Sequence, residues 1–222
     1  MEKELLIVAN GMNGEGIARC DGKVFFIDGA VKGDIVIVDV IKENRSFTTA
    51  KVKEYIKKSE HRCDPKCEYY GSCGGCNLMH INYDKQLEIK TQNVQNLADK
   101  SKLNIVVNKC VKSKEFAYRN KLTMYLTKNN KLGFYERNSK KLIDINKCLL
   151  VDDKFNNLIN KLNIFFNNNK EFNSIILKGI AIRQIQDKFI INLILNKKII
   201  TTKLENYLKL NKINYSLYYC VN

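Results

Sequence analysis

The chain has 222 residues, of which 45% are hydrophobic and 27% charged, so it is long enough to bury a core and too apolar to stay disordered. Its N-terminus has no basic segment followed by a long apolar segment, the pattern of a secretory leader, so we predict a cytoplasmic protein. No run of about 18 apolar residues occurs, which excludes a membrane-spanning helix. The formal net charge of +15 favours a polyanionic partner, above all nucleic acid, over a merely solvated lysine-rich surface.

The first sixty residues differ from the rest in charge and pattern. They hold ten basic and ten acidic residues, so the positive excess lies in residues 61–222, where 28 basic residues outnumber 13 acidic ones. Turn residues (Gly, Asn and Asp) break this region into five short apolar segments: ELLIVAN, GIARC, KVFFI, DIVIVDVI and FTTAKVKEYI. Five strands at this spacing predict a small OB-like β-barrel domain over residues 1–60.

Residues 61–222 predict a mixed α+β domain, so the fold class expected for the whole chain is α+β. Tyr83, Leu87, Thr91 and Val94 recur at helical spacing and predict a helix over residues 83–99. Strand-like segments follow (NIVVNKCV, NKLTMYLTKN, KLGFYER and KKLIDINKC), and then a helix at VDDKFNNLINKLNIFFNN. The last segments predict two strands, a short helix and a strand: SIILKGIAIRQIQ, KFIINLILN, KLENYLKLN and INYSLYYCVN. Because the sequence stops inside an apolar strand, we expect more protein to follow Asn222.

Four of the eight cysteines lie between residues 63 and 76. Cys67, Cys73 and Cys76 have the spacing C-x5-C-x2-C, and two glycines fill the last gap, which suits a tight loop with several thiolates directed at one point. A disulfide staple is disfavoured in a reducing cytosol, and a zinc ribbon normally has paired C-x2-C steps. The spacing favours a metal and leaves iron or zinc open. It also leaves the fourth ligand open among Cys63, Cys110, Cys148 and Cys20.

Two stretches resemble a known family. NGEGIARCDGKVFFIDGAVKGDIVIVDV resembles a TRAM domain, and C-x5-C-G-G-C followed by His80 and by YRNK resembles the RNA uracil-5-methyltransferases that carry a cluster. These enzymes transfer a methyl group from S-adenosylmethionine to C5 of a uridine in ribosomal or transfer RNA. The resemblance implies a structural 4Fe–4S cluster held by Cys67, Cys73, Cys76 and Cys148. It also implies RNA contacts by Arg119 and Lys121, and it gives no ligand role to Cys63, Cys110 or Cys20 and no assigned role to His80.

The same resemblance predicts that the catalytic half is missing from this chain. No glycine-rich motif opens a helix after a strand, and Cys220 lies in the last apolar strand without the features of a nucleophile, so we assign no catalytic residue. We expect the RNA-recognition half of a methyltransferase, whose helix 83–99 packs on a catalytic domain. A separate chain would supply that domain together with the S-adenosylmethionine site. The alternatives are a stand-alone RNA-binding metalloprotein, holding a cluster or zinc, and a zinc-stapled structural module.

Overall fold

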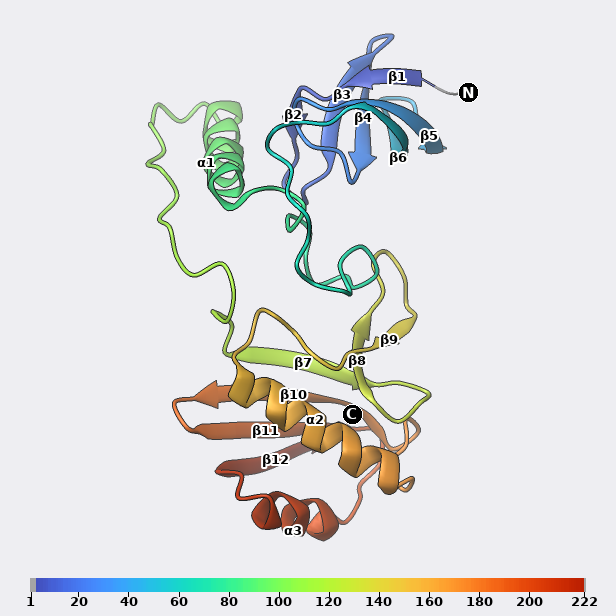
Figure 1. The fold of residues 1–222 in the computed structure, drawn as a ribbon, viewed down its shortest axis with the longest axis vertical. Coiled ribbons are helices and arrows are strands. Elements are labelled where there is room, and N and C mark those ends of the chain that lie inside the picture. The colour runs from blue at the N-terminus through green and yellow to red at the C-terminus, as the bar shows by residue number, and fades with distance from the viewer. Residues whose placement is uncertain (1–2, 222) are drawn as a thin grey trace. The chain divides into compact units, whose positions relative to one another are not determined.

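The computed structural model describes residues 3–221 and has a mixed α+β fold with two six-stranded sheets and three helices (Figure 1). It divides into two compact units. The first unit runs up to Glu68 and continues through Cys76–Lys112, and the second unit contains Tyr69–Gly75 and the chain from Ser113 onward. Within residues 3–221 no helix is both long enough and apolar enough to cross a lipid bilayer.

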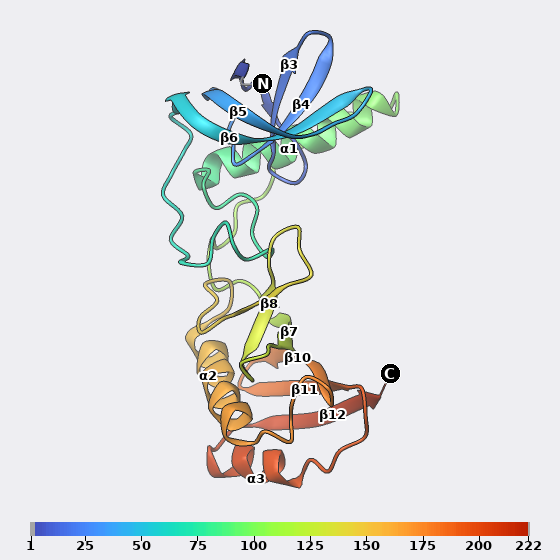
Figure 2. The same ribbon diagram turned by 90° about the vertical axis from the view of Figure 1, so that its right-hand side faces the viewer.

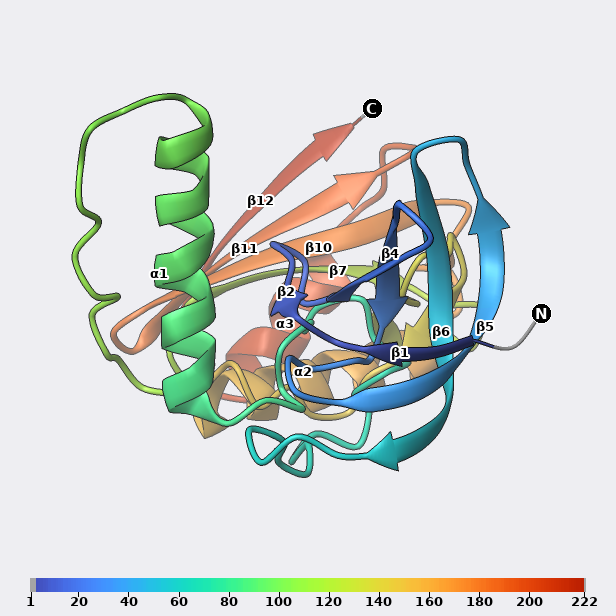
Figure 3. The ribbon, with the colours of Figure 1, turned by 90° about the horizontal axis from the view of Figure 1, so that it is seen from above.

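The sheet of the first unit has the strand order β1-β5-β6-β4-β3-β2 (Figure 3). Its strands are β1 (Lys3–Leu6), β2 (Ala9–Asn10), β3 (Gly16–Cys20), β4 (Lys23–Asp28), β5 (Ile35–Glu43) and β6 (Phe47–Lys57). The predicted count of five strands is corrected to six, because the first apolar segment breaks at Ile7 and Val8. Its two halves pair with opposite edges of the sheet, β1 with β5 and β2 with β3.

The first unit extends beyond the domain boundary expected at residue 60. The Arg62 side chain hydrogen-bonds to the Asp34 carboxylate and to the Gly29 carbonyl, which fastens the chain after β6 to the sheet. Helix α1 (Tyr83–Lys100) begins after Asn82, whose Oδ1 accepts a hydrogen bond from the Lys85 amide. Side-chain contacts across residue 60 therefore shift the boundary, which composition alone had placed there.

Helix α1 buries only part of its apolar surface within the first unit. Ile89 packs with Val31 and Ile81 in a small cluster, whereas the side chains of Val94 and Leu97 are 54% and 56% exposed. The expected packing of this helix on a catalytic domain stays a prediction.

The strand expected at NIVVNKCV does not form. Within residues 101–120 the chain has no regular secondary structure, and side chains of helix α1 supply hydrogen bonds to the backbone of residues 105–110 instead. Gln95 donates to the Ile105 carbonyl and accepts from the Val107 amide, and the Thr91 hydroxyl accepts from the Cys110 amide. A run of β-branched residues favours a strand only where a neighbouring strand is available to pair with it.

The second unit has a sheet with the order β12-β11-β10-β7-β8-β9, covered on one side by two helices (Figure 2). Its elements are β7 (Lys121–Leu126), β8 (Leu132–Tyr135), β9 (Leu142–Asp144), α2 (Asp153–Asn168), β10 (Leu177–Ile185), β11 (Lys188–Leu195), α3 (Thr202–Leu210) and β12 (Tyr215–Val221). All pairs are antiparallel except β11 with β12. Helices α2 and α3 bury their apolar residues in one core with alternate residues of the strands, as their periodicity predicts.

Candidate functional site

Cys73 lies in a loop that the second unit holds against the end of β8. The Gly74 amide donates to the Tyr135 carbonyl (3.0 Å), and the Arg137 amide donates to the Ser72 carbonyl (2.8 Å). A Cβ atom on Gly74 would lie 3.2 Å from the Tyr135 carbonyl oxygen, so glycine permits this close approach. Neither glycine of the C-G-G-C sequence has a positive φ. The Gly75 amide donates to Cys73 Sγ at 3.4 Å, the kind of contact that stabilises a thiolate ligand.

Cys148 lies in the loop between β9 and α2 of the same unit. The expected strand ending at Cys148 is corrected, because β9 ends at Asp144. Asn156, a buried residue of α2, holds the loop: its Oδ1 accepts from the Cys148 amide (2.8 Å) and its Nδ2 donates to the Cys148 carbonyl (3.1 Å). The Tyr69 hydroxyl accepts from the Asn146 amide at 3.2 Å, so the segment that carries Cys73 is fastened to the segment before Cys148.

Sequence reasoning missed both Tyr69 and Asn156. The sequence gives only a weak signal for Asn156, a polar residue among the apolar positions of a helix. Its partner, the backbone of Cys148, can be identified only once the fold of the loop is known. Tyr69 acts on a residue 77 positions away.

The other two proposed cluster ligands, Cys67 and Cys76, belong to the first unit and are half-buried. The exposed Cys63 also lies there, with its amide donating to the carbonyl of the buried His80 and its thiol donating to the Met79 carbonyl. Among residues 3–221 no group of three or more His, Cys, Asp or Glu side chains is gathered in a way that could hold a metal ion. The thiol groups of these cysteines are the donors that iron and zinc prefer in proteins.

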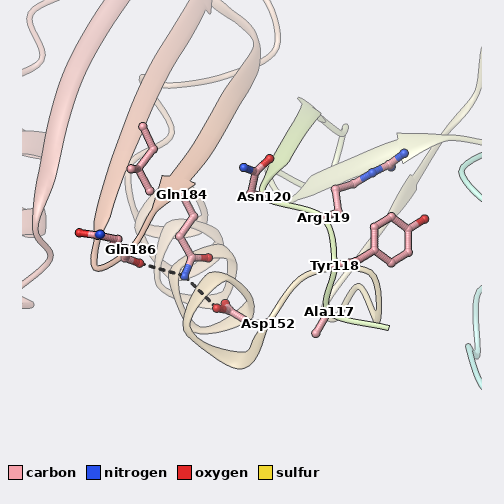
Figure 4. Close-up of a pocket in the computed structure, with 8 residues that line it drawn as sticks. Ala117, Tyr118, Arg119, Asn120, Asp152, Gln184 and Gln186 are labelled. Carbon is pink, nitrogen blue, oxygen red and sulfur yellow. Dashed lines mark hydrogen bonds between the residues drawn. The ribbon is translucent and has the colours of Figure 1, made fainter. Parts of the chain in front are cut away.

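Arg119 borders a hollow of about 480 Å³ in the second unit (Figure 4). The walls come from the segment before β7, the start of α2 and the turn between β10 and β11: Ala117, Tyr118, Arg119, Asn120, Asp152, Gln184, Ile185 and Gln186. The backbone fixes this arrangement, since the Arg119 amide donates to the Leu150 carbonyl and the Gln184 amide donates to the Asn120 carbonyl, both at 2.8 Å. Lys121 does not line the hollow; it is the exposed first residue of β7.

Some charged side chains near the hollow form hydrogen bonds or ion pairs, whereas Arg119 forms no ion pair with a residue that the structure describes. The Asp152 carboxylate accepts from the Phe155 amide and from Gln184 Nε2, both at 2.8 Å, so it caps α2 and orients the glutamine. Lys154 pairs with Asp187 at 2.6 Å, and this hydrogen bond raises the pKa of Lys154 and lowers that of Asp187. Arg119 is exposed and forms no ion pair with any residue that the structure describes. Its guanidinium is therefore available to an anion.

Comparison with known proteins matches the sheet of the first unit to a known domain family. A family model described as the TRAM domain matches residues 2–53. A solved structure, the tRNA (uracil-54, C5)-methyltransferase of Pyrococcus abyssi in complex with S-adenosyl-L-homocysteine, has a similar fold, with a TM-score of 0.70. The two are 22% identical in sequence, and the match covers 99% of this chain and 51% of that chain.

Curated relatives identify the family. An uncharacterized RNA methyltransferase of Streptococcus agalactiae is 37% identical over 71% of this chain and 37% of its own length. The 23S rRNA (uracil(1939)-C(5))-methyltransferase of Francisella tularensis subsp. novicida is 34% identical over 73% of this chain and 38% of its own length. The chain belongs to the family of TRAM-domain RNA (uracil-C5) methyltransferases. It spans little more than a third of the length of these curated relatives, and none of these matches supports the expected separate catalytic chain.

Proposed function

We propose that this chain recognises the RNA substrate of an S-adenosylmethionine-dependent uracil-C5 methyltransferase that acts on ribosomal or transfer RNA. The observation that carries the proposal is Arg119, an exposed cation beside a hollow lined by amide groups, in a strongly basic part of a chain of this family. Arginine contacts phosphate oxygens and base edges through paired donors, and the neighbouring amides of Asn120 and Gln184 offer both donors and acceptors. No residue of this chain is assigned to methyl transfer.

The exposed tyrosine in the same wall fits this proposal. Tyr118 is 54% exposed and borders the hollow next to Arg119, and Figure 4 shows both side chains directed away from Gln184 and Asp152. Proteins that read RNA loops combine cationic groups with aromatic faces on which unstacked bases rest. The hollow has both features within two adjacent residues, and the hydrogen bonds of Arg119 and Gln184 backbones keep its walls in place.

We further propose that Cys67, Cys73, Cys76 and Cys148 hold a 4Fe–4S cluster. The support is local: the Gly75 amide is directed at Cys73 Sγ, and Asn156 and Tyr69 order the loop around Cys148 and the loop around Cys73. A cluster with four cysteine ligands has no open iron position, so its contribution is to stabilise the fold. The chain's own contribution is to hold the backbone around Cys73 and Cys148, so that these two thiols are presented at fixed places within the second unit.

Replacing Arg119 with alanine should weaken RNA binding and make it less sensitive to salt. The loss of one phosphate contact lowers the slope of log Kd against log salt by about 0.7 to 0.9. The measurement is fluorescence anisotropy of a labelled RNA stem–loop with uridines in its loop, titrated between about 50 and 200 mM salt. Lys209→Ala, which removes an exposed charge from α3, is the control and should leave the slope unchanged. An unchanged slope for Arg119→Ala would remove this residue from the binding site.

A further inference from the structure

One face of the second unit's sheet is not covered by its helices. In β7 the side chains of Leu122, Met124 and Leu126 enter the core beneath α2, so the alternate residues Lys121, Thr123 and Tyr125 lie on the opposite face. The register places Arg183, Ala181 and Gly179 of β10 directly opposite these three residues, in that order. The face thus has a cationic end, a middle with small side chains and an aromatic end.

The cationic end consists of two like charges in direct cross-strand register. Lys121 and Arg183 are both exposed, and neither forms an ion pair with any other residue in the part of the chain that the structure describes. Like charges directly opposite each other destabilise a sheet, so this pair weakens the strand pairing unless an anion lies between the two side chains. Arg119, the position already proposed for RNA, precedes Lys121 by two residues in the chain.

The aromatic end consists of two tyrosine side chains that pack together, Tyr125 and Tyr135, and Tyr125 stands between two glycines in the sheet register. Gly179 of β10 and Gly133 of β8 are the register partners of Tyr125 on its two sides. A Cβ atom on Gly179 would lie 3.1 Å from the Tyr125 ring and 2.5 Å from the Met124 carbonyl oxygen. The Tyr135 ring packs on the Tyr125 ring, with centroids 4.7 Å apart and planes inclined by 49°. Glycine at such positions marks a place where something approaches a sheet closely, here the tyrosine ring itself.

The spacing of the two ends suits a short single strand of RNA. Tyr125 follows Lys121 by four positions, which at about 3.3 Å per residue is about 13 Å along the strand. Thr123 and Ala181 between them are too small to block a backbone that crosses the face. At the aromatic end, Asp144 is the register partner of Gly133 and accepts a hydrogen bond from Asn129. The cationic end has no such acidic neighbour in register.

We propose that this face, the sheet platform formed by Lys121, Arg183, Tyr125 and Tyr135, binds unpaired RNA. Phosphate groups lie against the two cations, and a base stacks on the tyrosine pair, which is how single-stranded nucleic acid is commonly held without sequence selection. The inference rests on the proposed RNA-recognition function and adds the surface that carries it. On β11 the same face carries Ile190, Asn192 and Ile194, and neither a cation nor an aromatic ring stands among these three residues.

The experiment tests the cationic end and the aromatic end of the platform separately, with variants of the full chain. The probe is a fluorescein-labelled single-stranded uridine-rich oligonucleotide, and binding is followed by anisotropy across a salt series. Lys121→Gln with Arg183→Gln should reduce the salt slope by about 1.4, the value for two phosphate contacts on a single strand. The matched control, Lys197→Gln with Lys198→Gln, removes two exposed lysines from the loop after β11 and should leave slope and affinity unchanged.

The aromatic end should respond differently. Tyr125→Leu should weaken binding by about tenfold or more with the salt slope unchanged, because stacking depends little on charge. Tyr125→Phe keeps the ring and should retain the affinity, which distinguishes loss of stacking from loss of folding. Circular dichroism melts of both variants report their folded state. Photocrosslinking of a 5-bromouridine oligonucleotide, followed by mass spectrometry, should place the adduct on Tyr125 or Tyr135.

Several outcomes would contradict the proposal that the platform binds unpaired RNA. If Arg119→Ala weakens binding while the double glutamine variant and Tyr125→Leu bind as the unmodified chain does, the face does not bind RNA and the proposed function still stands. The same conclusion follows if crosslinks form only elsewhere. If the unmodified chain binds neither the oligonucleotide nor the stem–loop, the proposed function itself is wrong.

Discussion

Replacing Arg62 with methionine should lower the free energy of unfolding of the first unit by about 3 to 5 kcal/mol, the usual effect of removing one partner from a buried ion pair. The Asp34 side chain is fully buried and that of Arg62 is 17% exposed, with Arg62 Nη2 2.5 Å from Asp34 Oδ2. The carboxylate also accepts from the Val31 amide (2.7 Å) and the Ser59 amide (2.8 Å). The variant would leave this buried charge without its counterion.

Arg62 has further contacts that methionine cannot replace. Its Nη2 donates to the Gly29 carbonyl at 2.6 Å, and its guanidinium lies 4.4 Å from the centre of the Tyr55 ring. Thermal unfolding followed by circular dichroism measures the change. Lys154→Met, which breaks the exposed pair with Asp187, is the control and should barely move the transition. An equal shift for the two variants would contradict the prediction.

The same ion pair gives the first unit a defined acid sensitivity. Burial raises the pKa of the Asp34 carboxyl, but the hydrogen bonds from Arg62, Ser59 and Val31 outweigh it and hold that pKa below its ordinary value. Because the folded pKa is lower than the unfolded value of about 3.9, this stabilisation is complete above that pH and is lost as the pH falls through the folded pKa. In Arg62→Met the pKa of Asp34 should rise, so the loss should begin at a higher pH.

Replacing Cys148 with serine should remove the iron and reduce the yield of soluble protein. A serine hydroxyl is a poor substitute for a thiolate ligand, and the loop that Asn156 orders would then present no sulfur. The chain purified without oxygen should contain about four irons and four sulfides with a broad brown absorption band, and the variant should contain almost none. Iron, sulfide and zinc per chain are measured together with the visible spectrum.

Cys63→Ser is the matched control for the iron measurement. Cys63 is exposed, and its thiol donates to the Met79 carbonyl at 3.4 Å, so this variant should keep its full iron content. A full cluster in Cys148→Ser together with loss of iron in Cys63→Ser would assign the fourth ligand to Cys63. One zinc per chain without colour would instead identify a zinc site and refute the cluster.

Local patterns in the sequence predicted the elements whose structure depends on neighbours along the chain. The helical spacing from Tyr83 to Val94 indicates α1, and the alternating strands and helices of the second unit follow from their periods. The break at Ile7 and Val8 was invisible, because the apolar run ELLIVAN is continuous and only pairing with two different strands bends it.

Contacts between distant residues account for the rest. Asp34 and Arg62 are 28 positions apart, and no pattern in the sequence identifies them as a pair. The hollow beside Arg119 is assembled from three separate segments, so its lining becomes visible only once the sheet register is known. The family resemblance implied Arg119 and Lys121 as RNA contacts, and the structure adds Arg183, the register partner of Lys121 on β10.

The division of the chain has a practical consequence. The polypeptide passes between the two units three times, after Glu68, after Gly75 and after Lys112, so neither unit is one continuous stretch. Ending the protein at residue 112 would leave the segment Tyr69–Gly75 without β8, the strand edge to which it is hydrogen-bonded. A single protease cut in the irregular stretch 101–112 would likewise leave both units joined through residues 68–76. Dissecting this protein therefore requires a short linker in place of residues 69–75, rather than a simple truncation.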